Sequence, residues 1–382
     1  MNQRSYLDYN ATAPLRAEVH DVVIEALALY GNPSSVHAEG RAARAAIEAA
    51  RVQVARLVGA RPEDVIFTSG GTEANALALA AQAGEAWHCY MSAVEHPSVL
   101  SGGRFYRETT TTVPVTADGV VALDALASEL EKHRPGGWRP LVSLMAANNE
   151  TGAIQPVAEA AKIVHEAGGL LHSDAVQAAG RVPLDISALD ADMLSLSAHK
   201  IGGPKGVGAL VLREGVSVEP LLKGGGQERR RRAGTENVAG IVGFGIAAEL
   251  AAADLAKVPE IAKLCDELEA GALAIAPDAA VLSARVPRLP NTTCLAVPGA
   301  KAETLVIGLD LAGVSVSSGS ACSSGKVEAS HVLRAMGVAP ELAQGAIRVS
   351  LGFATSNTDI QAFLRAFGEL IKRLKQSRKV AA

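Results

Sequence analysis

The stretch "DVIFTSGGTEANALALAAQAG", residues 64–84, joins a β-branched run to an alanine-rich run through two glycines. Its first six residues are typical of a buried strand, and the part after the glycines is typical of a helix. Another helical pattern, residues 158–168, ends in glycine. Further strand-like runs lie at residues 87–93, 139–147, 169–175 and 192–198. Strands that alternate with helices of this length predict an α/β fold with a mostly parallel sheet.

The length of the chain predicts two domains. Single hydrophobic cores usually stop growing below the 382 residues found here. After Pro259 the pattern changes to a helix, a proline-bounded strand, a helix, a glycine-serine loop and a terminal helix. We therefore expect a large domain over residues 15–256, and a smaller α+β domain formed by residues 1–14 and 257–382.

Composition excludes several classes of protein. With 36 Lys and Arg against 40 Asp and Glu, the net charge of -4 gives no reason to expect nucleic acid as a partner. The run Arg229–Arg232 is the exception, and we interpret it as a solvated or anion-facing loop.

The amino terminus lacks the apolar segment of a signal peptide. The apolar run from Val238 is glycine-broken, carries Glu249 and is short for a bilayer span. We expect a cytoplasmic protein with no membrane partner and a buried helix at Val238.

Polar residues follow several predicted strands at the edge where ligands collect in α/β sheets. Gly71 and Thr72 open a helix after the first strand, and free N–H groups at a helix start attract an anion such as phosphate. The same pattern is equally typical of a capped helix after a flexible turn. Asp174 ends another apolar strand, where a carboxylate needs a cation or a protonated nitrogen as partner, or caps the next segment.

The stretch "SLSAHKIGGPKG", residues 195–206, places Lys200 directly after a strand. Burial lowers the pKa of a lysine and makes its amine nucleophilic. Lys205 lies among turn residues, and we expect it to be exposed. A phosphate site, an acid for a ring nitrogen and a lysine for a Schiff base are together the requirements of pyridoxal 5'-phosphate. The order of these residues on successive strands therefore predicts that cofactor.

The four cysteines show neither zinc-ligand nor disulfide spacing, so we expect no metal site of the protein's own. Cys322 lies among serines and glycines in "SSGSACSSGK", which favours a reactive thiol over a packed one. Cys89 lies inside a strand and is expected to be structural, and Cys265 and Cys294 receive no role.

Two further residues stand out by their positions. His96 follows a strand and precedes a proline, where it could contact a cofactor ring, exchange protons near neutral pH or be structural. Arg348 lies in an apolar strand-like run, and a guanidinium there usually grips a carboxylate. That carboxylate could belong to a structural acid or to a ligand.

Taken together, the motifs have a family likeness that extends over nearly the whole chain. The chain resembles the cysteine desulfurases of the NifS/IscS-like group, class V pyridoxal-phosphate enzymes of fold type I, the aspartate aminotransferase fold. This resemblance implies a large domain with a mostly parallel sheet of the seven-stranded type. The motifs that carry the resemblance are "YLDYNATAP", "GNPSSVH", "FTSGGTEANALAL", "VEHPSV", "NNETG", "HSDAVQ", "SAHKIGGPKGVGAL", "GGGQERRRRAGTEN", "SSGSACSSG" and "IRVSLG". Two departures are small: Ala198 stands where glycine is more usual, and Gly71 where many relatives have alanine.

The resemblance implies a set of cofactor contacts. Lys200 would form the Schiff base, Asp174 would pair with the pyridinium nitrogen, and Gln177 would donate a hydrogen bond to the phenolic oxygen. The residues implied to hold the phosphate are Gly71, Thr72, Ser197 and His199, with Thr235 reaching the phosphate of the other subunit in a homodimer.

The resemblance also implies substrate contacts. His96 would stack on the ring and move thiol protons, Asn149 would lie by cofactor and substrate, and Arg348 would bind the substrate carboxylate. Cys322 would accept sulfur from L-cysteine as a persulfide, releasing L-alanine, and pass the sulfur to an iron–sulfur scaffold or another acceptor protein. In that transfer Cys322 could transiently share a scaffold-held cluster. The alternatives are a selenocysteine lyase, which needs no protein thiol, and a non-enzymatic sulfur carrier or scaffold.

Overall fold

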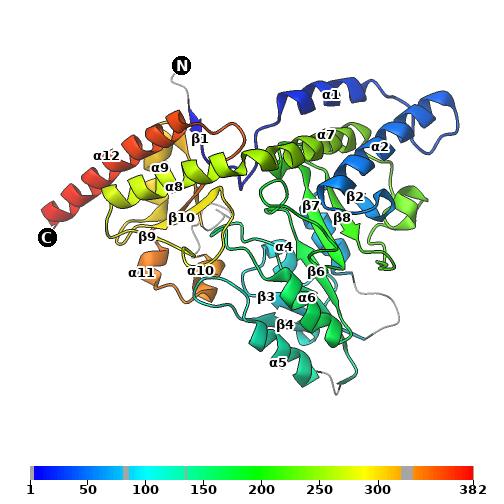
Figure 1. The fold of residues 1–382 in the computed structure, drawn as a ribbon, viewed down its shortest axis with the longest axis horizontal. Helices are drawn as coiled ribbons and strands as arrows, with labels where there is room; N and C mark the ends of the chain where they lie inside the picture. Colours follow the sequence, from blue (N-terminus) through cyan, green and yellow to red (C-terminus); the bar gives the residue numbers. More distant parts are fainter. Residues whose placement is uncertain (1–3, 81–85, 134–135, 320–329, 382) are drawn as a thin grey trace.

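The computed structural model describes residues 4–80, 86–133, 136–319 and 330–381 (Figure 1). Its strands are β1 Ser5–Tyr6, β2 Val65–Thr68, β3 Trp87–Ser92, β4 Thr110–Val113, β5 Arg139–Ser143, β6 Leu170–Asp174, β7 Met193–Ser197, β8 Gly208–Leu212, β9 Ala280–Val281, β10 Thr292–Ala296, β11 Val314–Ser315, β12 Ser317–Ser318 and β13 Ala346–Ser350. Its α-helices are α1 Ala17–Leu27, α2 Ala38–Leu57, α3 Gly71–Ala78, α4 Pro97–Leu100, α5 Leu123–His133, α6 Val157–Glu166, α7 Val238–Asp254, α8 Val258–Ile275, α9 Ala302–Leu311, α10 His331–Ala335, α11 Pro340–Ala343 and α12 Asn357–Ala381.

The large sheet has seven strands in the order β2-β8-β7-β6-β5-β3-β4. Only β8 runs against its neighbours, so β2 and β7 on either side of it still point the same way. The carboxyl ends of β2, β3, β5, β6 and β7 therefore meet at one edge. The predicted α/β fold with a mostly parallel sheet is confirmed.

Helices cover both faces of this sheet because its strands are apolar on both sides. In β2, Phe67 packs with residues of α2 and α7 on one face. The adjacent Ile66 faces the other side and packs with Leu77 of α3. The same alternation in the other strands produces two separate apolar layers, one on each face.

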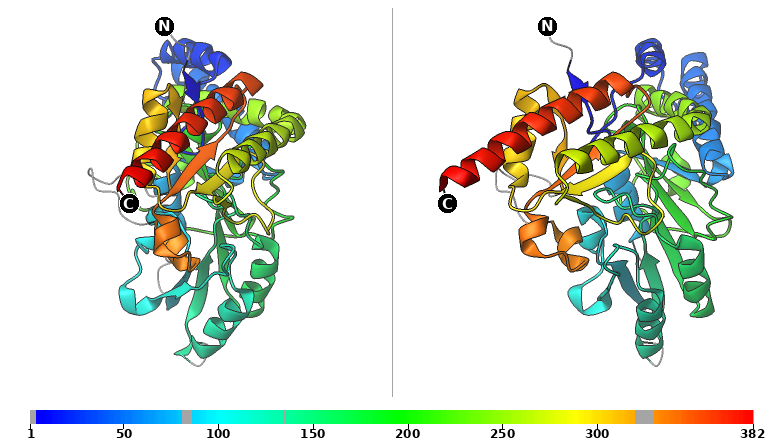
Figure 2. Two further views of the ribbon diagram at one scale, coloured as in Figure 1. Left: turned by 90° about the vertical axis from the view of Figure 1, so that its left-hand side faces the viewer. Right: turned by 60° about the vertical axis from the view of Figure 1, so that its left-hand side comes forward.

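The helix α7 is the buried helix predicted from the run at Val238. The stretch Val238–Ile275, which joins α7 to α8, is long and apolar enough to cross a membrane by length and composition. Half of its most apolar window is buried inside the protein, where α7 packs on α1 and α2 (Figure 2). Its hydropathy is accounted for by this position in the core.

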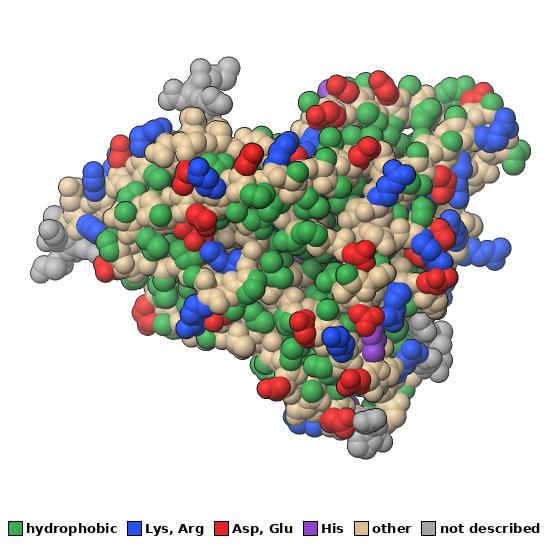
Figure 3. Space-filling view, viewed as in Figure 1, with side chains coloured by type: hydrophobic (Ala, Val, Ile, Leu, Met, Phe, Trp, Pro, Cys, Tyr) green, Lys and Arg blue, Asp and Glu red, His purple; other side chains and the backbone are tan. Residues whose placement is uncertain are grey.

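A second, four-stranded antiparallel sheet has the order β12-β13-β10-β9. Helices α8, α9 and α12 pack with it around a separate apolar cluster that includes Leu7 of the amino-terminal arm. The arm also adds β1 in parallel to β11. The division at residues 15–256 stays a prediction. The face of the molecule in Figure 3 mixes acidic and basic side chains without a large field of one sign.

Candidate active site

A cavity of about 240 Å³ opens at the carboxyl edge of the large sheet. Each lining segment follows a strand of that sheet, which is why residues distant in sequence meet there. The cavity is lined by Gly71, Thr72, Asn75, His96, Ser98, Met145, Ala147, Asn149, Asp174, Val176, Gln177, Ser197, His199 and Lys200. The cavity thus gathers nine of the predicted site residues.

A short 3-10 turn, Ala198–Lys200, directs Lys200 away from the end of β7. Gly202 then turns the chain with a φ of +84°, a conformation that favours glycine. The Lys200 Nζ donates hydrogen bonds to the carbonyl oxygens of Asn10 at 2.6 Å and Ala11 at 2.8 Å. The amino-terminal arm therefore fixes the lysine amine at the wall of the cavity, while Lys205 is exposed as predicted.

The environment of Lys200 lowers its pKa to about 7. Burial is the largest cause, and the positive charges of Arg348 and Arg181 act in the same direction. Asp174 and Asp8 partly oppose them. Near neutral pH, a large share of this amine is therefore unprotonated and able to attack a carbonyl carbon or remove a proton.

Asp174 ends β6 with its carboxylate in the cavity. Its Oδ2 accepts a hydrogen bond from Asn75 Nδ2 at 2.7 Å, and its Oδ1 accepts one from the Val176 N–H at 3.0 Å. Asn75 was not among the predicted site residues, although it lies four residues after Gly71 and therefore on the same side of α3. These neutral donors leave the carboxylate without a cationic partner among the contacts described.

His172, two residues before Asp174 in β6, connects the central strands of the large sheet through its side chain. The His172 Nδ1 lies 2.8 Å from Ser143 Oγ, and its Nε2 lies 2.8 Å from Ser195 Oγ. Complete burial lowers the pKa of His172 to about 4. The ring is therefore neutral near pH 7 and acts as a bridge between β5, β6 and β7.

The end of the cavity beside α3 combines a helix start with polar side chains. Gly71 and Thr72 begin the helix, and Ser197 and His199 approach from the end of β7. Burial lowers the pKa of His199 to about 4, and its Nδ1 lies 3.1 Å from Thr12 Oγ1. A neutral imidazole, a hydroxyl and free helix N–H groups form a donor set suited to phosphate.

His96 stands on the other side of the cavity, at the start of α4. Its Nδ1 accepts the Ser98 N–H at 3.1 Å and lies 2.8 Å from Ser98 Oγ. Desolvation by the surrounding walls lowers the pKa of His96, Lys200 adds to this effect, and Asp174 opposes it. The imidazole is therefore able to accept a proton from a ligand at neutral pH.

Two predicted residues lie outside the cavity lining. Arg348 is buried in β13, where its Nη2 pairs with Asp8 at 2.8 Å and its Nη1 donates to the Asn149 carbonyl at 2.9 Å. Of the two alternatives for the carboxylate that Arg348 binds, the structure shows the structural one, Asp8. Arg348 contacts the cavity lining through its hydrogen bond to Asn149. Thr235 is exposed on the loop before α7.

The arginine run is built differently from a free basic patch. Arg229 and Arg231 donate to the Glu63 carbonyl, and Arg232 pairs with Glu73 at 2.9 Å. Arg230 is exposed. The run therefore contains both a bound part and a solvated part, next to the helix that begins at Gly71.

The described cysteines are all buried. The pKa of Cys89 is raised to about 12, that of Cys265 to about 11 and that of Cys294 to about 12, in each case chiefly by burial. These thiols are therefore unreactive at neutral pH, as the sequence predicted for Cys89. Cys322 lies outside the described residues.

The donor set of the cavity fits pyridoxal phosphate. It offers a helix start for a phosphate, a carboxylate for a ring nitrogen, an amide for a phenolic oxygen and an amine for an aldehyde. These groups come from Thr72, Asp174, Gln177 and Lys200, which all line the same space.

Known proteins are similar to this chain over nearly its whole length. The aminotransferase class-V family model matches residues 5–363. A cysteine desulfurase of Cereibacter sphaeroides is 46% identical, and the match covers 98% of this chain and 97% of the relative. Cysteine desulfurase IscS of Dictyoglomus turgidum is 42% identical, and the match covers 98% of this chain and 96% of the relative. A solved NifS-like protein from Rickettsia africae aligns with a TM-score of 0.87 at 37% identity, over 97% of this chain and 100% of that one. The chain therefore belongs to the aminotransferase class-V family, and the cysteine desulfurases are the members to which it is similar.

Proposed function

We propose that this protein is a cytoplasmic, pyridoxal-phosphate-dependent cysteine desulfurase. In the overall reaction, L-cysteine and the thiol of Cys322 give L-alanine and a persulfide on Cys322. The observation that carries the proposal is the cavity in which an amine with a lowered pKa faces the carboxylate of Asp174. Near full-length similarity to cysteine desulfurases supports the substrate, as does a solved relative described as "SspA in complex with cysteine", with a TM-score of 0.77 at 29% identity.

The cofactor would be held by residues that line the cavity. The phosphate would be bound by Gly71, Thr72, Ser197 and His199, the ring nitrogen by Asp174, the phenolic oxygen by Gln177 and the aldehyde carbon by Lys200. His96 would cover one face of the ring, and Asn149 would lie beside it. When bound, the cofactor supplies an electron-withdrawing ring that stabilises negative charge at the α-carbon of the substrate.

The protein's own residues would then move protons and orient the substrate. Lys200 would take the α-proton on its Nζ, because its lowered pKa leaves a share of the amine free near neutral pH. Asp174, held by Asn75 and the Val176 N–H, would keep a proton on the ring nitrogen. Arg348 would bind the substrate carboxylate in competition with Asp8.

Cys322 is proposed as the sulfur acceptor. Its thiolate would attack the substrate sulfur, and the bond between sulfur and β-carbon would break as the sulfur–sulfur bond forms. The electron pair of the broken bond would pass to the β-carbon side, and that carbon would take up a proton to become the methyl group of alanine. An ordinary thiol, with a pKa of about 8.5, is mostly protonated at neutral pH, so a base is needed. The lowered pKa of His96 makes its neutral imidazole the proposed acceptor of that proton.

The proposal extends to partners. A homodimer would bring Thr235 to the phosphate of the other subunit, which agrees with its exposed position. The persulfide would pass to an iron–sulfur scaffold or another acceptor protein, where Cys322 could transiently touch a cluster.

Incubation of the purified protein with L-cysteine tests the proposal directly. We expect alanine to form and Cys322 to gain the mass of one sulfur atom. Cys322→Ser should abolish alanine formation from cysteine but spare alanine formation from selenocysteine. Equal loss or equal retention of both reactions in this variant would count against the desulfurase assignment. Absence of both colour and turnover in the wild type would indicate a carrier or scaffold.

A further inference from the structure

A buried guanidinium lies directly behind the candidate active site. Arg181 lies in the turn segment between β6 and β7, and its residue surface is 9% exposed. Within the described part of the chain, its hydrogen bonds go to neutral oxygens: the main-chain and side-chain oxygens of Gln177 and the carbonyl of Tyr9. A buried cation without a carboxylate is costly, so its position calls for a reason other than an ion pair.

The first consequence of this arrangement concerns the Gln177 amide. Arg181 Nη1 donates to the Gln177 main-chain oxygen at 2.9 Å and also to its Oε1. A guanidinium has no acceptor, so only the oxygen end of the amide can face it. The Nε2 end is thereby turned the other way, where it donates to the Asn10 carbonyl at 3.0 Å. Gln177 itself lines the cavity.

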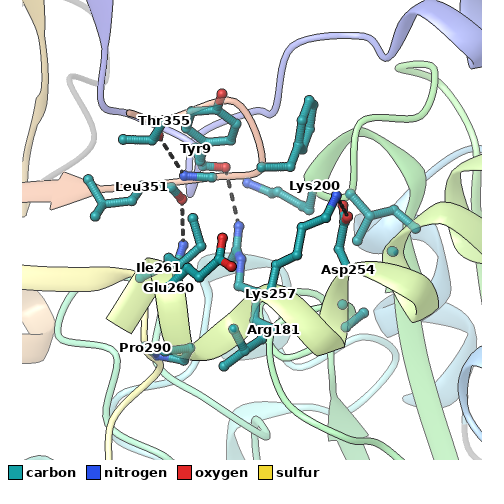
Figure 4. A pocket seen from close by; sticks show the side chains of 18 of the residues that line it. Tyr9, Arg181, Lys200, Asp254, Lys257, Glu260, Ile261, Pro290, Leu351 and Thr355 are labelled. Atoms are coloured by element: carbon teal, nitrogen blue, oxygen red, sulfur yellow. Dashed lines mark hydrogen bonds and ion pairs between the residues drawn. The ribbon is translucent and has the colours of Figure 1, made fainter. Parts of the chain in front are cut away.

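The second consequence concerns Lys200. Its amine shares the Asn10 carbonyl with the Gln177 amide. Arg181 and Lys200 both line a second cavity, of about 140 Å³. Figure 4 shows this cavity, with the hydrogen bond from Arg181 to the Tyr9 carbonyl as a dashed line. The charge of Arg181 contributes to the lowered pKa of Lys200, after burial and Arg348.

We propose that Arg181 is a positioning residue for the cofactor site, which fixes the Gln177 amide with its N–H group toward the cofactor's phenolic oxygen. The charge of Arg181, which lines the second cavity together with Lys200, also favours the neutral form of that amine. This role rests on the proposed function only in its choice of cofactor. The competing role is purely structural: Arg181 would pin the amino-terminal arm through Tyr9, and the site would not respond to its charge.

Cofactor capture by the apo protein separates these roles without any turnover. Arg181→Met should weaken pyridoxal-phosphate affinity about tenfold or more, because a hydrogen bond to a charged group contributes roughly 1.5–3 kcal/mol. If Arg181 acts through Gln177, the same change in a Gln177→Leu background should have little further effect on affinity. Equal losses in both backgrounds, or no loss in either, would overturn the role of the amide.

The titration of Lys200 in the apo protein gives a second readout. The pH dependence of its acylation, followed by mass spectrometry, should shift to higher pH in Arg181→Met, because a nearby positive charge is gone. Arg181→Lys keeps the charge and should keep the wild-type midpoint while still weakening cofactor capture. An unchanged midpoint in Arg181→Met would contradict the bias on Lys200.

Two controls keep these outcomes distinct. Arg285→Met removes an exposed arginine that pairs with Asp118 and lines neither cavity, so it should leave both readouts unchanged. Should Arg181→Met fail to fold, Arg181→Lys and Gln177→Leu still decide the amide role. A wild type that captures the cofactor but does not desulfurate cysteine would overturn the proposed reaction and leave this role intact.

Discussion

The two sides of the candidate active site are built in different ways. On the side of the large sheet, Asp174 and Lys200 follow adjacent strands and are fixed by neutral hydrogen-bond partners. On the side of the small sheet, Arg348 of β13 is tied to Asp8, an acid from the amino-terminal arm. One side thus presents groups ready for a cofactor, whereas the other presents a cation that is already paired.

A buried carboxyl marks the second side as well. Glu150 accepts a hydrogen bond from Ser330 Oγ at 2.6 Å, and burial raises its pKa to about 7. Ser330 caps α10 directly after the segment that contains Cys322. The reactive groups on the large sheet are thus held in place by neutral hydrogen bonds, whereas the paired Arg348 and Asp8 and the buried Glu150 gather where the smaller sheet meets it.

The largest effect is expected at the preorganised side. Lys200→Ala should lower the rate of alanine formation by roughly 100- to 10,000-fold, the range that a general base contributes. The matched control is Lys205→Ala, five residues later and exposed, which should retain near wild-type turnover. Strong residual activity in Lys200→Ala, measured as alanine released from cysteine, would remove the lysine from the mechanism.

The pH dependence of cofactor capture should report the same lysine. Only the neutral amine attacks the aldehyde, and the pKa of Lys200 is about 7. The capture rate of the apo protein, followed by absorbance, should therefore fall about tenfold per pH unit below pH 7 and level off above it. An inflection near pH 10 would show that the environment of Lys200 does not lower the pKa of its amine.

At the paired side, Arg348→Ala should act mainly on substrate binding. Loss of a charge-assisted contact to the carboxylate should raise KM about 10- to 100-fold with a smaller change in kcat. Arg334→Ala, an exposed arginine in α10, serves as the control. An unchanged KM would mean that Arg348 serves Asp8 alone.

A smaller effect is expected in stability at Glu150. Burial raises the pKa of its carboxyl to about 7 in the folded state. The protein therefore becomes less stable, by the contribution of this one group, as pH rises from the pKa of the unfolded chain through 7. Glu150→Gln removes that loss. The difference between the free energies of unfolding of the variant and the wild type should therefore be roughly 2–3 kcal/mol larger, in favour of the variant, at pH 8 than at pH 4. Chemical denaturation at the two pH values measures this difference. The exposed Glu341→Gln should show none, and a parallel shift at both pH values would contradict the raised pKa.

Sequence patterns predicted the elements of the large sheet because strand and helix periodicities are local. The expected strand at residues 139–147 begins with β5 at Arg139 but ends at Ser143, where the chain leaves the ladder. The helix after Gly71 is shorter than its alanine-rich pattern, since α3 ends at Ala78. Composition alone does not state where packing against the sheet stops.

Lys200 and Asp174 could be recognised from the chain alone as candidates for chemistry, because Asp174 ends an apolar strand, Lys200 comes just after another, and such residues meet at one sheet edge in this fold class. Tertiary structure alone decided the rest. Asp8 reaches Arg348, the Asn10 carbonyl holds Lys200, and Arg181 orients Gln177 from outside the cavity. The physical reason is that these contacts join the amino-terminal arm to segments more than 160 residues away, or depend on which end of an amide faces a buried charge, and neither leaves a periodic trace in the chain.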